Sequence, residues 1–281
     1  MEMTQTRRGA YHQDNVTYWT GRASGYSAVN QDELATGQRA VWGSLLRERI
    51  GAQFPGREPG AIRVLDIGTG PGFFAILMAE AGYDVTAVDY TAAMLREARH
   101  NAGPLADRIC FRQMNAEALD FPSARFDVVL SRNLTWNLAD PEAAYRQWVR
   151  VLKPGGLLLN FDANWYRYLY DEAALGAHAQ DRQNVADLQV EDDTAGTDVD
   201  AMEAIARQAP LSRQARPVWD AELLRRLGMR VEVEREIWRR VWTRAERINN
   251  ASTPMFLIRA VKRRAAALRR AERPVPAGAA V

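Results

Sequence analysis

One short run constrains the fold more than any other: V-L-D-I-G-T-G-P-G-F-F at residues 64–74. Its apolar start predicts a short buried strand, and Phe74 to Ala81 predict the first turns of a helix. Between them, Gly68, Gly70 and Gly72 suit a tight loop that lets a ligand approach the backbone. The helix start adds free N–H groups and a positive dipole end. This unit predicts an α/β protein with a nucleotide-like ligand at the carboxyl edge of a parallel sheet.

A second strand strengthens that prediction. Residues 84–89 are mostly apolar and end in Asp89, 23 residues after Asp66. An acid at the tip of the second strand can accept hydrogen bonds from both ribose hydroxyls of a nucleoside. The alternatives are a plain turn at the glycines and a helix N-cap at Asp89. The glycines follow G-x-G-x-G, which differs from the G-x-G-x-x-G of nicotinamide-binding proteins.

These features resemble the class I S-adenosylmethionine (SAM)-dependent methyltransferases, of the small-molecule type. The resemblance spans roughly residues 18–165 and includes the acidic-x-G-x-G-x-G loop, Asp89 and the L-K-P-G-G run at 152–156. It implies a doubly wound, mostly parallel seven-stranded sheet with a Rossmann-like methyltransferase fold. It also implies an enzyme that uses SAM and releases S-adenosylhomocysteine (SAH).

The resemblance also implies a set of cofactor-binding residues. A leader at 15–26 matches a W-x₃-A-x₂-Y-type segment that folds over the cofactor in this family, although its aromatic residues could instead only fasten the first helix. Asn115 stands where the family usually carries an acid, and an amide oxygen can accept the same adenine amino proton. The predicted cofactor set is Tyr18, Trp19, Tyr26, Asp66, Gly68, Thr69, Gly70, Gly72, Asp89, Tyr90, Met94, Asn115, Ala116, Glu117, Arg132 and Asn133.

Later segments supply the candidates for acceptor binding and proton transfer. Residues expected to line the acceptor site are Trp136, Asn137, Asn164, Trp165 and Tyr170. Asp162 is the first candidate for a general base, with Tyr166 and His178 behind it, although Asp162 could simply end a strand with hydrogen bonds. No metal is expected, because the three histidines are scattered and no acidic cluster could hold Mg²⁺.

The chain divides by composition into five predicted segments. These are a leader at 1–30, with 1–13 disordered or dependent on a partner; a SAM-binding core at 31–163; an insertion at 164–218; the end of the core sheet at 219–262; and a basic tail at 263–281. The insertion follows the fifth strand, so it predicts a lid over the acceptor, with a low-complexity linker as the alternative.

The composition and net charge limit the classes of partner that we expect. The net charge is +2, from 37 basic and 35 acidic residues, so we expect neither nucleic acid nor a membrane as partner. Cys110 is the only cysteine and no long apolar run is present, which predicts a cytoplasmic protein. Exposed aromatic residues are compatible with a homo-oligomer.

The predicted reaction is metal-independent methylation of a small acceptor on carbon, nitrogen or oxygen, as in natural-product metabolism. The density of Trp and Tyr in the leader and at 162–170 favours an apolar, aromatic or isoprenoid acceptor. Two alternatives stay open: a methyltransferase acting on RNA or protein, and a nucleotide-binding Rossmann oxidoreductase or non-catalytic SAM binder.

Overall fold

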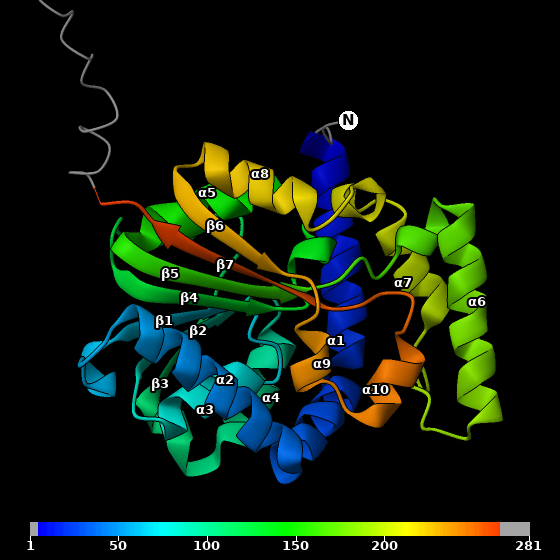
Figure 1. Cartoon of the computed structure of the whole chain (residues 1–281), viewed down its shortest axis with the longest axis horizontal. Coiled ribbons are helices and arrows are strands. Elements are labelled where there is room, and N and C mark those ends of the chain that lie inside the picture. The colour runs from blue at the N-terminus through cyan, green and yellow to red at the C-terminus, as the bar shows by residue number, and fades with distance from the viewer. Residues whose placement is uncertain (1–4, 265–281) are drawn as a thin grey trace, which may run out of the picture.

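The computed structural model describes residues 5–264, and within them the chain forms one seven-stranded sheet (Figure 1). The strands are β1 (Arg63–Ile67), β2 (Asp84–Asp89), β3 (Ile109–Gln113), β4 (Phe126–Arg132), β5 (Leu152–Asp162), β6 (Met229–Glu234) and β7 (Phe256–Lys262). Their order is β3-β2-β1-β4-β5-β7-β6, and only β7 runs antiparallel to its neighbours. The predicted doubly wound, mostly parallel sheet is confirmed.

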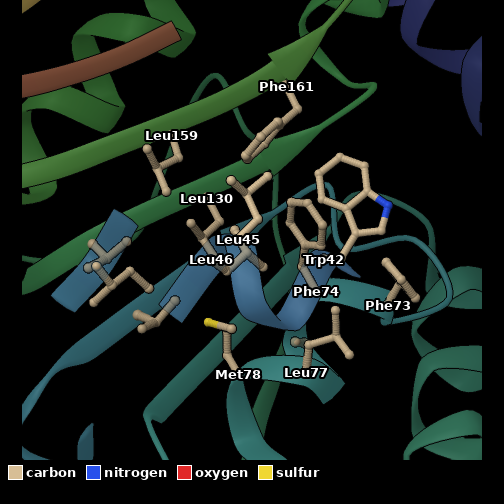
Figure 2. Packing of buried hydrophobic residues seen from close by; sticks show 14 of the residues in the cluster. Trp42, Leu45, Leu46, Phe73, Phe74, Leu77, Met78, Leu130, Leu159 and Phe161 are labelled. Carbon is tan, nitrogen blue, oxygen red and sulfur yellow. The ribbon is translucent and has the colours of Figure 1, made fainter. Parts of the chain in front are cut away.

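Helices cover both faces of this sheet, which is why its central strands are mostly apolar and buried. Neighbouring residues of β1 illustrate the alternation. Val64 packs with α2 (Gly37–Gln53) and α3 (Phe73–Glu80), whereas Leu65 packs with α5 (Pro141–Val151) and α8 (Val218–Arg226). Figure 2 shows the first of these clusters, where the ring of Phe161 lies 5.1 Å from Trp42 and 5.6 Å from Phe74, edge to face in both pairs.

The insertion lies on the outer flank of the molecule (Figure 1). It contains α6 (Glu172–Asp187) and α7 (Val199–Ala206). Helix α6 packs on α10 (Arg244–Asn249), and α7 packs on α1 (Gln5–Ala35). Helix α10 and the short α9 (Trp238–Val241) are additions that the sequence did not predict. The remaining elements are α4 (Ala92–Ala102), η1 (Pro59–Ala61), η2 (Gly103–Arg108), η3 (Thr135–Asn137), η4 (Arg167–Leu169) and η5 (Pro210–Arg213).

Helix α1 corrects the expectation of disorder in residues 1–13. From Gln5 onward the chain is helical, and α1 runs across the edge where the parallel strands end (Figure 1). The buried face of α1 is a narrow stripe that includes small and polar residues. Because few of these residues are apolar, the sequence shows no hydrophobic periodicity that would reveal the stripe. The stripe consists of Tyr11, Asn15, Ala23, Ser27 and Asn30. Residues 1–4 and 265–281, including most of the predicted basic tail, lie outside the described part.

Helix α1 ends at Ala35 and α2 begins at Gly37, with Thr36 as the N-cap between them. Strand β5 begins at Leu152, so the L-K-P-G-G run is part of the strand, beside a register shift between Phe126 and Val128. Within residues 5–264, the structure contains no helix with the length and apolar character needed to cross a membrane.

Candidate cofactor site

The glycine loop after β1 has the left-handed backbone that its sequence predicts. Gly68 and Gly70 have φ values of +66° and +53°. A Cβ added to Gly68 would lie 2.7 Å from a methyl of Leu134, and one added to Gly70 would lie 3.5 Å from the ring of Tyr26. A side chain at Gly68 would therefore collide with Leu134, and one at Gly70 would touch Tyr26, in addition to needing a backbone that residues other than glycine rarely adopt.

Asp89, at the tip of β2, holds this loop in place. Its Oδ2 accepts a hydrogen bond from the amide of Gly70 at 2.9 Å, and its Oδ1 accepts one from the amide of Thr91 at 2.8 Å. Burial raises the pKa of the Asp89 carboxyl, and these hydrogen bonds partly offset the shift. Each oxygen keeps a lone pair for a ligand hydroxyl.

A cavity opens at this edge of the sheet, between the strand ends and α1. Its empty space, including the open mouth, is about 840 Å³. Predicted cofactor residues that line it are Trp19, Tyr26, Gly68, Gly70, Asp89, Tyr90, Met94, Asn115, Ala116, Glu117, Arg132 and Asn133. The predicted acceptor residue Asn137 also lines it.

Sequence reasoning missed several lining residues. They are His12, Asn15, Val16, Thr91, Met114, Leu134 and Leu138. His12 comes from residues 1–13, for which we expected disorder or dependence on a partner, and Asn15 and Val16 belong to the leader at 15–26. Hydrophobic periodicity gives no signal for them, because the buried stripe of α1 is partly polar. The others directly neighbour predicted residues at the strand ends.

A smaller cavity adjoins the first and contains two more predicted residues, Asp66 and Thr69. The hydroxyl of Thr69 donates to Oδ2 of Asp66 at 2.6 Å. Burial raises the pKa of Asp66 to about 6. Two predicted residues lie outside both cavities. Tyr18 packs beside Trp19 in the aromatic cluster near α7, and Gly72 lets α3 approach Ala98, which would lie 3.1 Å from an added Cβ.

Arg132 lines both cavities, but its guanidinium is already paired. It donates to both carboxylate oxygens of Glu33 on α1, at 2.8 Å each, and lies 4.7 Å from the ring centre of Phe73. The carboxylate of Glu33 raises the pKa of Arg132, although burial opposes it. Arg132 therefore fastens the end of α1 to β4, and a ligand carboxylate would have to share it with Glu33.

Glu117 has a structural task that limits its role toward adenine. Its Oε1 accepts hydrogen bonds from the amides of Ala139 and Asp140 at 2.7 and 3.0 Å, and its Oε2 lies 3.4 Å from Nε2 of His12. Asn115 Oδ1 accepts from the amide of Glu117 at 2.8 Å. The side-chain oxygen of Asn115 can accept one further hydrogen bond, and Asn115 lines the cavity.

Asp162 does not have the surroundings of a general base. Its side chain is fully buried, and Oδ1 accepts from the amide of Ala163 and the indole N–H of Trp165, each at 2.9 Å. Oδ2 accepts from Arg216 and the amide of Trp136, each at 3.0 Å, and from the hydroxyl of Thr135. Every lone pair is used, so we correct the prediction: Asp162 fastens the end of the insertion to β5.

The other two candidates for proton transfer also lie away from the cavity. His178 is on α6 and stacks on Tyr168 with ring centres 4.0 Å apart. Burial lowers the pKa of His178. Tyr166 packs against Trp136 with ring centres 4.8 Å apart, in the cluster near α7. Burial raises the pKa of Tyr166, so its hydroxyl stays protonated near neutral pH. Neither residue is placed to act as a base on a ligand in the cavity.

Most predicted acceptor residues likewise have structural roles. Trp136 is buried and its indole N–H donates to the carbonyl of Asn133. Asn164 donates to the carbonyl of Arg216, Trp165 bonds Asp162, and Tyr170 bonds the carbonyl of Arg207. None of these four lines the described cavities, because tertiary partners hold their polar atoms elsewhere.

The fold defines a Rossmann-like α/β protein, with a cavity at the edge of the sheet where the parallel strands end. Residues 65–160 match the family model described as "Methyltransferase domain". Residues 65–160 therefore form a methyltransferase domain, in agreement with the predicted resemblance to SAM-dependent methyltransferases and with SAM as the cofactor. Gly68, Gly70 and Asp89 all line the cavity, where they can meet an adenosyl group.

Similar proteins agree with this assignment. A ubiquinone biosynthesis O-methyltransferase of Alkalilimnicola ehrlichii is 35% identical over 116 residues, which are 41% of this chain and 47% of that protein. The ubiquinone/menaquinone biosynthesis C-methyltransferase UbiE of Shewanella woodyi is 34% identical over 143 residues, 49% of this chain and 54% of that protein. The chain spans about half the length of the curated relatives that it matches.

A solved structure is similar in fold. It is the phosphoethanolamine N-methyltransferase 2 of Haemonchus contortus, in complex with phosphomonomethylethanolamine and SAH. The TM-score is 0.51 at 17% identity, covering 78% of this chain and 53% of the other. At this identity the likeness concerns the fold.

Proposed function

We propose that this chain transfers the methyl group of SAM to a small, apolar acceptor of aromatic or isoprenoid type, without a metal ion. One observation carries the proposal. Asp89 and the glycine loop are locked together at the tips of β2 and β1, beneath α1, and they still present unused acceptors and open space. That arrangement suits the sugar of a nucleoside cofactor.

The residues of the chain mainly position the cofactor and the acceptor and enclose them. Asp89 would hold the ribose hydroxyls, and Asn115 with the backbone of Ala116 would hold the adenine edge. Tyr26 and Arg132 would face the amino-acid end. SAM itself supplies an activated methyl group, so holding the two partners in line and excluding water are the main tasks left to the protein.

An apolar acceptor is favoured by the cluster next to the cavity. Trp19 lines the cavity and also packs against the cluster of Tyr11, Trp136, Met202 and Ile205. Residues of α7 thus bring the insertion to the wall of the cavity, which supports its role as an acceptor lid. The names of the relatives place them in ubiquinone and menaquinone biosynthesis, and we propose an acceptor of that chemical class for this chain.

The remaining parts of the proposal concern metal and partners. Within residues 5–264, no group of three or more His, Cys, Asp or Glu side chains could hold a metal ion. The near-balanced charge supports a small-molecule acceptor rather than nucleic acid. A cytoplasmic location and self-association complete the proposal.

An acceptor screen tests it. The full chain is incubated with SAM and either prenylated and unprenylated phenols and quinols, or hydrophilic amines and tRNA, and the release of SAH is measured. We expect turnover on phenols or quinols, a product heavier by one methylene, and the same rate in EDTA. Turnover confined to hydrophilic amines or tRNA would refute the acceptor class.

A further inference from the structure

Asn133, directly after β4, has a backbone that few residues tolerate. Its φ is +55°, in the left-handed region that glycine and asparagine enter most readily. Its amide donates to the carbonyl of Phe161 at 2.8 Å, and its carbonyl accepts from the indole of Trp136 at 3.0 Å. The main chain is therefore held on both sides, and the side chain lines the large cavity.

The amide oxygen of this side chain has no partner. Oδ1 of Asn133 is buried and accepts no hydrogen bond. A buried, unpaired oxygen costs free energy, and glycine would satisfy the same backbone without that cost. An oxygen kept in this state is expected to meet a positive or hydrogen-bearing group of the ligand.

The neighbours of Asn133 indicate which part of the cofactor that group belongs to. Asp89, across the glycine loop, faces the sugar end. Tyr26 faces Asn133 and also Arg132, whose positive charge is offset by Glu33. Asn133 thus lies between the sugar end and the amino-acid end. In SAM, the atom that joins these two parts is the positively charged sulfur.

We propose that Asn133 Oδ1 is the group by which this cavity prefers SAM to SAH, an inference that rests on the proposed function. The two cofactor forms differ by one methyl group and one positive charge. A carbonyl oxygen attracts the sulfonium and has no such attraction for the neutral thioether. Preference for the charged form would also speed the replacement of product by fresh cofactor.

Calorimetry with the full chain tests this inference, using SAM and SAH as separate ligands. Asn133→Gly keeps the left-handed backbone and removes the oxygen. We expect it to weaken SAM binding about tenfold or more and to leave SAH binding within about twofold. Asn133→Asp keeps an oxygen at the same place and adds charge, so it should widen the preference for SAM.

A matched control comes from Gln189, which has a φ of +50°, is exposed, and lies outside both cavities. Gln189→Gly makes the same backbone change and should alter neither affinity. Equal losses of SAM and SAH binding in Asn133→Gly, or no loss of either, would overturn the inference while leaving the proposed function intact. If the unmodified chain binds neither ligand, the proposed function fails, and this inference with it.

Discussion

At the scale of single residues, three acidic side chains at the cavity are held in three different ways. Asp89 accepts from two backbone amides and keeps room for a ligand. Glu117 uses one oxygen on two amides and the other near His12. Asp66 is the most enclosed, with Thr69 as its hydrogen-bond donor and a raised pKa. Each environment leads to a different response to pH or mutation.

The first prediction concerns Asp66. Its pKa is about 6 in the folded chain against an ordinary 3.8, so the folded state keeps the proton at a pH where the unfolded chain releases it. This contribution to stability is present below pH 4 and is lost as pH rises through about 6. Asn mimics the protonated acid. The stability of Asp66→Asn relative to the natural chain should therefore rise by about 1–3 kcal/mol between pH 4.5 and pH 7.5.

Urea unfolding at the two pH values measures this difference. The comparison is between the two proteins at each pH, so the titration of all other groups cancels. A stability difference that does not change with pH would show that Asp66 ionises normally.

The second prediction concerns the glycine loop and Asp89. Gly70→Val forces a branched side chain into φ +53°, against the ring of Tyr26, and Asp89→Ala removes the acceptor that holds the loop. Both changes should weaken SAH binding about 100-fold or more while the fold persists. Gly196→Val is the matched control, since its φ is +70° with open space around it. Calorimetry and circular dichroism report the two properties, and full SAH affinity in either cavity variant would contradict the site.

At the scale of elements, α1 acts as a roof that is tied down along its length. Near its start, Arg8 bonds Asp140 at 2.7 Å, and the Tyr11 hydroxyl donates to Oδ1 of Asn137 at 3.0 Å. Near its end, the carboxylate of Glu33 accepts hydrogen bonds from both terminal nitrogens of the Arg132 guanidinium. Polar ties, rather than a broad apolar face, hold this helix.

The third prediction follows from the tie at its end. Glu33→Gln leaves the buried guanidinium of Arg132 with a neutral partner, so the end of α1 should open more often, at a cost of about 1–3 kcal/mol. Hydrogen exchange should speed up in residues 26–35 and not in α5. Glu142→Gln removes an exposed ion pair with Arg146 and should change neither the stability nor the hydrogen exchange of residues 26–35. Unchanged exchange in α1 of Glu33→Gln would show that Arg132 does not fasten the helix.

The fourth prediction concerns the buried pair that anchors the insertion. Arg216 bonds both Asp162 and Asp220, and all three side chains are at most 1% exposed. Asp162→Asn removes one of its two anionic partners and should destabilise the fold by about 2–5 kcal/mol. Urea unfolding tests this. A base would behave differently: turnover would vanish with stability unchanged, and that result would restore Asp162 as a catalytic candidate.

At the scale of the whole molecule, the cavity lies between a rigid floor and an added roof. The strand ends form the floor, α1 forms the roof, and the insertion packs on α1 through α7 (Figure 1). A ligand in the cavity contacts both layers. Its binding energy should therefore stabilise the molecule as one unit.

The fifth prediction gives the size of this stabilisation by a bound ligand. At SAH concentrations of 100 times the dissociation constant, unfolding should cost about 2.7 kcal/mol more. For a chain of this size the midpoint of thermal unfolding should rise by roughly 5–10 °C. NAD should cause no shift, and Asp89→Ala should abolish the shift with SAH. A shift with NAD alone would indicate an oxidoreductase-type nucleotide site instead.

The sheet, the glycine loop and Asp89 could be predicted because their signals are local. Gly68, Gly70 and Asp89 act through backbone conformation and strand position, and both are written in short runs of sequence. The polar stripe on α1 was not predicted, because hydrophobic periodicity cannot reveal a buried face that contains Asn15, Ser27 and Asn30. Its partners lie far along the chain, as with Glu33 and Arg132, which are 99 residues apart.

By itself, the sequence determined the mostly parallel sheet, the glycine loop and the acid at the tip of β2, since these follow from residue type and spacing. Tertiary structure alone decided what the other polar groups do. Asp162 has the chemistry of a base, but Arg216, 54 residues away, takes up its charge. Asn133 is an ordinary amide whose oxygen became unpaired only when β4, β5 and α1 enclosed it. Ionisable and polar groups take their function from their neighbours, and folding chooses those neighbours.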